Sequence, residues 1–368
     1  MKYNEKLLLK LLQAGLGSKT ELAAVDVDEE LLLDLYKLSA QQTVRGIVLD
    51  GVLETFEGRI TKSKTLLKWY TVVLNIEATN KLLNEVAGDV SRRFVDEGLH
   101  PVIAKGQVVA LDYPNPLHRE CGDIDFYFLP REGMFAVELM KRWGYRVIDE
   151  SPRDVSFECN GVTIEIHPYM VHSVHLEDEK LAQSIQCWFE QQCVDYCQTI
   201  KLYNTEKEVC APSVILNVVY EFYHLWMHFV RGEGVGLRQI CDWRMTLHNF
   251  YGKYDVDELY DLLGRFRLRR QWVAFGGILV DYLGLPAEEM PFYKKSYKSR
   301  KILKVIFRDG NFGRNKVKRK SPTTKFGRLV NRINEILSRY MTLFAIFPVV
   351  SLRFLPSIKS VNNILRKK

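Results

Sequence analysis

The sequence predicts an α+β protein in which a small mixed sheet carries helical flanks on its N-terminal and C-terminal sides. Leucine-rich groups with helical spacing occupy residues 1–98. Short apolar segments separated by turn residues follow in 99–205, and long apolar-periodic segments return in 206–290. We therefore expect a helical N-terminal region, a sheet-containing core, a helical C-terminal region and, over 291–368, a basic helical tail.

The N-terminal region is expected to form helices around its leucine groups, with Asp26 or Asp28 capping the second. A longer helix is predicted from about Ser63 to Gly98. Its apolar residues fall three or four apart, so we expect them to form one continuous stripe in the core. The stripe consists of Leu67, Tyr70, Leu74, Ala78, Leu82, Val86, Val90 and Phe94.

The core region contains the clearest strand signals. Asn160-Gly161 separates two alternating segments, 155–159 and 162–167, and this pattern predicts a β-hairpin. On the second strand Thr163, Glu165 and His167 share one face. A short buried strand is expected over 101–104, a short helix over 107–111 and a helix over 132–144.

The C-terminal helical region is expected to hold helices over 212–230 and 237–250, with one or two more in 256–285. His224 and His228 are four apart, a spacing that suits either a zinc site or a hydrogen-bonded buried pair. Because no Glu or Cys nearby completes a zinc site, the pair is favoured. Arg238 and Asp242 are also four apart and predict either a structural ion pair or a role in shaping a cleft.

Composition and charge place the chain among soluble globular proteins, with 47% hydrophobic and 26% charged residues. The N-terminus lacks the apolar segment of a signal peptide, and no run of about 18 apolar residues predicts a membrane span. The seven cysteines are scattered without CxxC pairs, which favours reduced thiols and a cytoplasmic location. Residues 291–368 hold 21 Lys or Arg against two acids, whereas residues 1–290 hold 31 against 43.

The basic tail has three interpretations. In the first, it packs on the acidic body. In the second, it neutralises nucleic-acid phosphates. In the third, it lies on an anionic membrane surface and makes the protein membrane-peripheral. An apolar stretch within 339–358, which includes Phe344, Phe347, Phe354 and Leu355, favours the membrane over nucleic acid.

The pattern of residues in Cys121–Phe128 predicts a glycine turn followed by a strand. Asp123 and Asp125 are two apart, so on a strand their carboxylates leave the same face. Two adjacent anions repel each other, and a divalent cation with oxygen ligands relieves that repulsion. The alternative is a solvated strand edge. Glu165, on another strand, is the third acid that such a metal site needs.

Positive and glycine residues upstream suit a phosphate. Gly106 allows close backbone approach at the start of a short helix, and Lys105 adds charge. Arg119 is a second candidate for a phosphate or carboxylate contact, or else anchors its loop by pairing with Glu120 or Asp112. His167 is expected to touch the metal, to bind substrate, or only to hydrogen-bond Glu165.

These residues resemble a bacterial family of uncharacterised nucleotidyltransferases, within the DNA polymerase β-like nucleotidyltransferase superfamily. The resemblance covers roughly residues 40–290 and leaves the tail outside. A departure from the superfamily is Lys105-Gly106 in place of its Gly-Ser turn. The matching segments are Ala104-Lys105-Gly106, Tyr113-Pro114, Arg119, Gly122-Asp123-Ile124-Asp125, Glu165-Ile166-His167, His228, Gly236-Leu237-Arg238 and Asp242-Trp243.

The resemblance implies an enzyme that moves a nucleotidyl group from an NTP, such as ATP, to a hydroxyl acceptor. It implies Asp123, Asp125 and Glu165 as metal ligands, with two Mg²⁺ ions expected and Mn²⁺ as the alternative. Lys105, Gly106, Arg119 and Gly122 would then contact the nucleotide, and His167, His228, Arg238 and Asp242 would lie near the substrate. The sequence leaves the acceptor open among a sugar, a small molecule, a protein side chain and an RNA end. The alternative function is a non-catalytic binding or partner protein that keeps the nucleotide fold.

Overall fold

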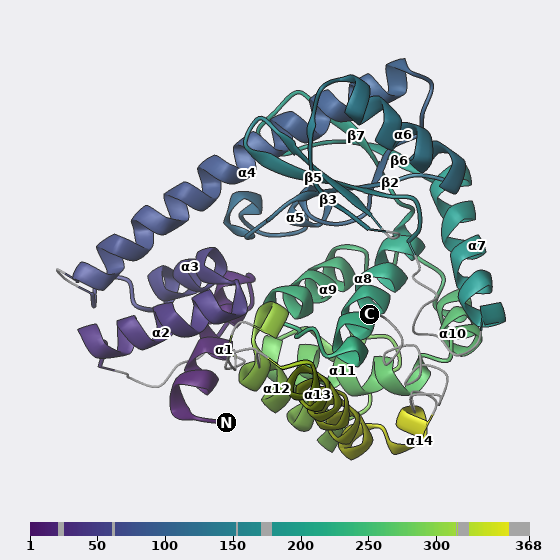
Figure 1. The fold of residues 1–368 in the computed structure, drawn as a ribbon. Coiled ribbons are helices and arrows are strands. Elements are labelled where there is room, and N and C mark those ends of the chain that lie inside the picture. The colour runs from purple at the N-terminus through teal and green to yellow at the C-terminus, as the bar shows by residue number, and fades with distance from the viewer. Residues whose placement is uncertain are drawn as a thin grey trace.

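The computed structural model describes residues 1–20, 26–60, 63–151, 154–170, 179–313, 315 and 324–352. A mixed sheet lies at one end of the molecule, and a helical assembly built from both ends of the chain lies at the other (Figure 1). This arrangement confirms the predicted α+β class with helical flanks.

The first half of the chain supplies the N-terminal helices and most of the sheet. Its elements are α1 (Tyr3–Gly15), α2 (Glu29–Gln42), α3 (Arg45–Thr55), α4 (Lys64–Asp96), β1 (Val102–Ile103), α5 (Gln107–Ala110), η1 (Pro116–His118), β2 (Ile124–Tyr127), α6 (Pro130–Arg142), β3 (Arg146–Glu150), β4 (Val155–Cys159) and β5 (Val162–His167).

The second half completes the sheet and adds the C-terminal helices. Its elements are α7 (Glu179–Asp195), β6 (Gln198–Lys201), β7 (Glu208–Ala211), α8 (Val214–Arg231), α9 (Leu237–Asn249), α10 (Val256–Arg265), α11 (Arg269–Leu283), η3 (Ala287–Glu289), α12 (Tyr297–Asp309), η4 (Asn311–Gly313), α13 (Lys325–Ile346) and α14 (Pro348–Ser351).

The sheet has seven described strands in the order β3-β4-β5-β2-β1-β7-β6. β2 runs parallel to β5 and β1 parallel to β7, while the other neighbours are antiparallel. The predicted hairpin is confirmed as β4 and β5, joined by Asn160 at φ 51° and Gly161 at φ 82°. Both values lie in the left-handed region that an Asn-Gly hairpin turn requires.

The long helix is confirmed as α4, which begins after the cap Ser63. The prediction that its apolar stripe is buried throughout is wrong. Val86, Val90 and Phe94 are buried, but Leu67 and Leu74 are exposed, as are Tyr70, Ala78 and Leu82. A strict spacing of four residues advances about 40° past each full turn, so the stripe winds around the helix. Only its last part faces the sheet.

Two apolar cores hold the molecule together. One lies on a single face of the sheet, where the C-terminal half of α4 and helix α6 pack on Ile124, Phe126, Ile164 and Ile166. The larger core joins α1–α3 to α8–α12 and includes Trp243 and Trp272. The helical regions at the two ends of the sequence therefore share one core.

The expected region boundaries need adjustment. Strand β7 lies wholly beyond residue 205 and pairs with β1 through Cys210. The sheet region therefore extends to Ala211. Helix α12 of the basic tail buries Ile302, Leu303 and Ile306 in the larger core. The beginning of the tail is thus part of the body, because apolar residues line one side of an otherwise basic helix.

All seven cysteines are free thiols. Within the part of the chain that the structure describes, the helices are too short or too polar to cross a bilayer. Phe354 and Leu355 lie outside the described residues.

Candidate active site

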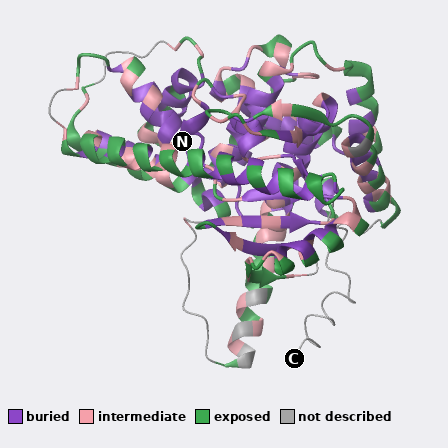
Figure 2. Ribbon diagram, turned by 90° about the horizontal axis from the view of Figure 1, so that it is seen from above, coloured by how far each residue is buried: buried purple, intermediate pink, exposed green. Residues whose placement is uncertain are grey.

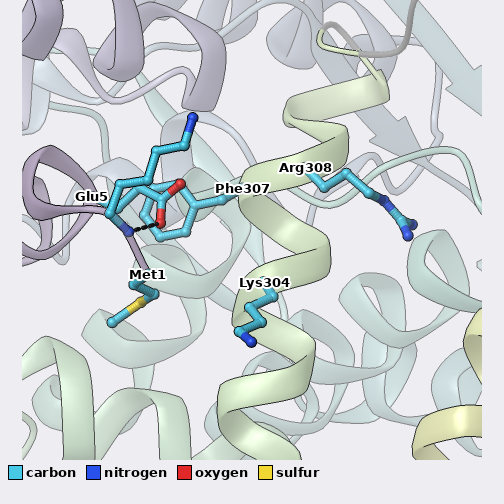
Figure 3. Close-up of a pocket in the computed structure, with 6 residues that line it drawn as sticks. Met1, Glu5, Lys304, Phe307 and Arg308 are labelled. Carbon is cyan, nitrogen blue, oxygen red and sulfur yellow. Dashed lines mark hydrogen bonds between the residues drawn. The ribbon is translucent and has the colours of Figure 1, made fainter.

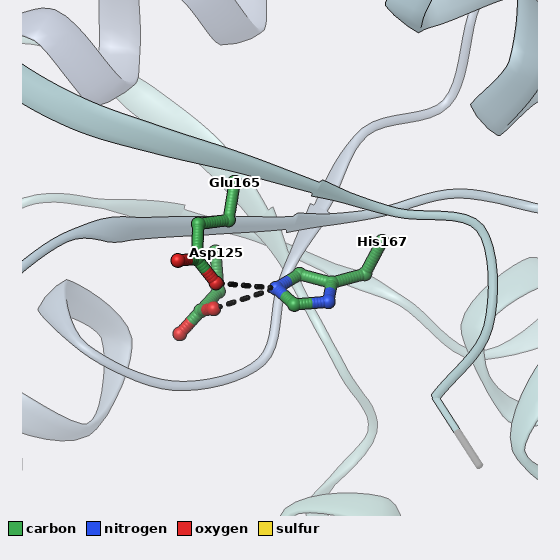
Figure 4. A group of neighbouring side chains, drawn as sticks. All are labelled: Asp125, Glu165 and His167. Carbon is green, nitrogen blue, oxygen red and sulfur yellow. Dashed lines mark hydrogen bonds and ion pairs between the residues drawn. The ribbon is translucent and has the colours of Figure 1, made fainter. Parts of the chain in front are cut away.

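The candidate site is built by the parallel pairing of two neighbouring strands. In the register of β2 and β5, Asp125 lies opposite Glu165 and Tyr127 lies opposite His167. Paired residues share a face of the sheet, and the alternate residues fill the core on the other face. The pairing thus places Asp125, Glu165 and His167 together (Figure 4). They lie on the face of the sheet where Tyr127 contacts Tyr220 of α8.

The three side chains form a tight group. Among the described residues they are the ones whose ligand atoms all lie within 4.8 Å of one another. The His167 Nε2 atom lies 2.8 Å from Asp125 Oδ1 and 3.3 Å from Glu165 Oε2. Its ring stacks on Tyr127 at 4.9 Å between centroids. The predicted contact of His167 with Glu165 is present, next to a shorter one with Asp125, and its roles toward a metal or a substrate stay predictions.

Lys105 adds a positive charge next to the group. Its Nζ atom lies 3.1 Å from Asp125 Oδ2 and 3.2 Å from His224 Nε2. Although burial alone would lower the pKa of Lys105, the charge of Asp125 raises it, so the side chain is an ammonium ion. The predicted triphosphate contact of Lys105 therefore competes, in this structure, with an ion pair to Asp125.

Burial and the surrounding charges shift the pKa values of Asp125, His167 and Asp123 in different directions. Burial would raise the pKa of Asp125, but Lys105 and His167 hold it well below its usual range. Burial would likewise lower the pKa of His167, yet its hydrogen bonds to Asp125 and Glu165 raise it to about 9. Burial, reinforced by the charges of Asp125 and Glu165, raises the pKa of Asp123 to about 6. The carboxylates of Asp125 and Glu165 thus face two cations, Lys105 and protonated His167, while Asp123 adds a third carboxylate on the side of Arg238.

Asp123 lies just before β2 and not within it. It is not among the three residues whose ligand atoms lie within 4.8 Å of one another, and its role as a metal ligand stays a prediction. The cause is local, because the chain reaches the regular strand only at Ile124. Gln107 Nε2 donates to the Asp123 carbonyl at 3.1 Å and holds this approach to the strand.

The two predicted glycines differ in what they allow. Gly106 has φ 60° and ψ −111°, a conformation that side chains other than glycine rarely adopt. Gly122 is exposed, and an added Cβ there would meet nothing within 4 Å. The Gly122 backbone is therefore open to a ligand, and its contact with a nucleotide stays a prediction.

The predicted histidine pair is confirmed and continues the network. The Nε2 atoms of His224 and His228 lie 3.0 Å apart, and His228 Nδ1 lies 2.7 Å from Glu233. Burial and the nearby Lys105 charge lower the pKa of His224 well below its usual value, so it is neutral and accepts from Lys105. A polar chain thus runs from Asp125 through Lys105 into α8.

Arg119 contacts a protein carboxylate in this structure, and its contact with a phosphate stays a prediction. It is buried and donates to Asp242 from Nε at 2.7 Å and from Nη2 at 2.8 Å. Tyr113 donates to the same carboxylate at 2.6 Å. Arg119 pairs with neither Glu120 nor Asp112, and Asp242 does not pair with Arg238. Tertiary packing brings the η1 loop to α9 and overrides the i,i+4 pair.

Arg238 instead donates to the Glu120 carbonyl at 2.7 Å. Its charge acts on Asp123 and lowers the pKa of that carboxyl against the larger effect of burial. Because it is half-buried beside the acidic approach to β2, Arg238 suits a phosphate better than Arg119 does.

Sequence reasoning missed two contributors to the site. The spacing of His224 and His228 predicted their pairing, but nothing in the sequence pointed to the contact of His224 with Lys105. Tyr220 of α8, whose hydroxyl lies 2.7 Å from that of Tyr127, had no signal because both are ordinary core aromatics in the sequence.

The donor set fits a hard divalent cation. Two carboxylates in register provide the oxygen ligands that Mg²⁺ prefers, and an imidazole within reach extends the set to Mn²⁺.

Comparison with known proteins agrees with this geometry. A sequence model of a family described as uncharacterised nucleotidyltransferase matches residues 29–284, which include every residue of the candidate site. No curated protein matches the chain. No solved structure matches it either. Because the match covers more than half of the sequence, the chain belongs to the uncharacterised nucleotidyltransferase family.

Proposed function

We propose that this protein transfers a nucleotidyl group from a metal-bound NTP to a hydroxyl acceptor at the Asp125 group. The observation that carries the proposal is the register of β2 and β5, which sets Asp125 against Glu165 with His167 beside both. Membership of the nucleotidyltransferase family supports the same reaction class.

Asp125 and Glu165 would hold the metal, with Asp123 close enough to share a second ion. When bound, the metal neutralises phosphate oxygens and lowers the pKa of an attacking hydroxyl. His167 would keep the two carboxylates in place through Nε2. We expect Mg²⁺ as the ion, with Mn²⁺ as its alternative.

Positive charge around the group would bind the triphosphate. Lys105 faces Asp125 at 3.1 Å, and Arg238 lies on the Asp123 side. In the transfer, the acceptor oxygen bonds to the α-phosphorus and the bond from that phosphorus to the bridging oxygen breaks. Pyrophosphate leaves, and the hydroxyl proton passes to Glu165, whose side chain is 27% exposed.

The test has a binding stage and a turnover stage. Thermal unfolding is measured with each NTP, with Mg²⁺ or with a chelator, and we expect a metal-dependent rise in melting temperature. Each NTP labelled at the α-phosphate is then incubated with the protein and a cell extract. Label transfer to one acceptor, lost with Asp125→Asn, supports the proposal. Metal-dependent binding without transfer to any acceptor would favour the non-catalytic alternative.

A further inference from the structure

Helix α13, outside the family match, exposes a row of apolar side chains. Leu337 and Met341 are 54% and 60% exposed. They are four residues apart, so they lie on one face of the helix. Val330, Ile333 and Phe344 are exposed on the same face, and we call these five residues the α13 stripe. A contiguous apolar row of this length on a surface marks a site of interaction.

The body of the protein contacts α13 from another side. Leu343 and Ile346 are buried in the larger core, and Arg339 donates from Nη1 to the Arg231 carbonyl at 2.8 Å. Figure 2 shows α13 projecting from the rest of the molecule, with few buried residues along it. The contact at its C-terminal end fixes the helix and leaves the stripe uncovered by the described residues.

Basic residues of α12 lie beside α13. Helix α12 lies beside the C-terminal part of α13, where Lys301 Nζ donates to the Ala345 carbonyl at 3.2 Å. Lys298 Nζ lies 5.1 Å from the centre of the Phe347 ring. Among the described side chains of α13, Arg339 donates to the body and Glu335 is exposed. The apolar row of α13 therefore lies next to the basic side of α12.

The basic surface continues along α12. Lys304, one turn beyond Lys301, and Arg308 line a hollow of about 530 Å³ between α12 and the N-terminus (Figure 3). Lys2 adds a third basic residue there, and the one acid, Glu5, accepts from the Lys2 backbone N–H at 2.7 Å. The exposed side of α12 is thus basic along its length.

These observations select one occupant. Nucleic acid would neutralise the basic surface but leave the α13 stripe in water. A second copy of this tail would cover the stripe but bring like charges together. An anionic bilayer surface satisfies both features, because its phosphates and carboxylates attract Lys and Arg while its acyl boundary accepts apolar side chains.

We propose that α13 docks along the surface of an anionic membrane, with the stripe inserted at the headgroup boundary and α12 over the headgroups. The rest of the chain supports this orientation. Residues 1–290 carry 43 acids against 31 Lys or Arg, so an anionic surface repels the body and attracts only the tail.

The test uses the full-length protein and sedimentation with vesicles of phosphatidylcholine, with or without phosphatidylserine. We expect binding to vesicles that contain phosphatidylserine, and a loss of about tenfold or more when added salt screens the charges. Equal binding to both kinds of vesicle, or to neither, would overturn the proposal.

Paired variants separate insertion from charge. Leu337→Glu with Met341→Glu should abolish vesicle binding, and both positions are exposed, so the fold tolerates the change. Leu67→Glu with Leu74→Glu on α4 is the matched control, because it removes an equally exposed apolar pair and should leave binding unchanged. The double variant Lys301→Glu with Lys304→Glu should also abolish vesicle binding. The double variant Lys301→Arg with Lys304→Arg keeps both positive charges and should retain vesicle binding.

Three other outcomes would contradict membrane docking. The first is vesicle binding that survives the α13 stripe variant. The second is a change in oligomeric state, measured by light scattering, as the only effect of that variant, which would assign the stripe to a second copy. The third is tight binding to RNA that depends on Lys301 and Lys304 but not on Leu337, which would assign the surface to nucleic acid.

Discussion

The Asp125 group and the Arg119–Asp242 pair are both made of buried charges, but they are satisfied in different ways. Each carboxylate oxygen of Asp242 accepts from Arg119 or Tyr113, and the pair is closed to solvent. In the Asp125 group the carboxylate of Asp125 contacts both Lys105 and His167, and Glu165 reaches the surface. An opening to solvent therefore distinguishes the candidate ligand site from a closed structural ion pair.

The largest expected effect is on activity, in the Asp125 group. Asp125→Asn should lower nucleotidyl transfer by roughly 10²-fold or more, because the metal loses a charged ligand. The fold should remain, since Asp123 and Glu165 still face Lys105 and His167. The rate of pyrophosphate release and the circular dichroism spectrum measure the two effects. Full activity in this variant would remove Asp125 from the mechanism.

The matching change in the closed pair should act on stability. Asp242→Asn leaves the buried Arg119 without a counter-ion and should lower the free energy of unfolding by about 3–5 kcal/mol. Denaturant unfolding measures this loss. Asp261→Asn is the control, because Asp261 is largely exposed 3.9 Å from Arg269, and its loss should cost less than about 1 kcal/mol. Equal costs at the two positions would contradict a structural role for Asp242.

A third change tests how Lys105 links metal and phosphate. Lys105→Met removes the ammonium ion that pairs with Asp125, so binding of Mn²⁺ alone should not weaken. Transfer should fall by roughly tenfold or more through a higher KM for the NTP, because a charged contact to phosphate is lost. Weaker Mn²⁺ binding with an unchanged KM would show that Lys105 serves only to position Asp125.

The smallest expected effect concerns His118, a charged residue outside both clusters. Its Nδ1 lies 2.7 Å from Asp50 and its Nε2 lies 2.9 Å from Glu77. Burial would lower the pKa of His118, but these carboxylates raise it above the unfolded value. The resulting stability is fully present below the unfolded pKa and is lost as pH rises through the folded pKa.

His118→Gln should therefore destabilise the protein more at about pH 6 than at about pH 9. Because His167 is unchanged in the variant, the difference in melting temperature between the two proteins isolates His118. A difference that does not depend on pH would show that His118 acts as a neutral hydrogen-bonding residue.

Much of the fold followed from local patterns in the sequence. The Asn160-Gly161 turn, the Ser63 cap and the helix starts depend on neighbouring residues, and these predictions are confirmed. The α4 stripe failed because burial depends on where a long helix meets the sheet. The exposure of Leu67 and Leu74 is set by tertiary placement, which spacing alone does not contain.

The candidate site was likewise predictable where local patterns determine it and not where distant residues meet. Asp125 and Glu165 were found from strand spacing, and their pairing followed from the hairpin and the neighbouring strand. The roles of Lys105, Arg119 and Asp242 were not, because each depends on a partner more than 15 residues away. Whether a buried ion pair is closed to solvent depends on which charged residues the fold brings together from distant parts of the chain.

The position of a radioactive label tests the central claim most directly. The protein, Mg²⁺ and a cell extract that supplies the acceptor are incubated with an NTP labelled at the α-phosphate and, in parallel, with the same NTP labelled at the γ-phosphate. The account predicts that the α-label passes to an acceptor while the γ-label leaves in pyrophosphate, and that Asp125→Asn stops both. Transfer of the γ-label to the acceptor, or undiminished transfer by Asp125→Asn, would contradict nucleotidyl transfer at this site.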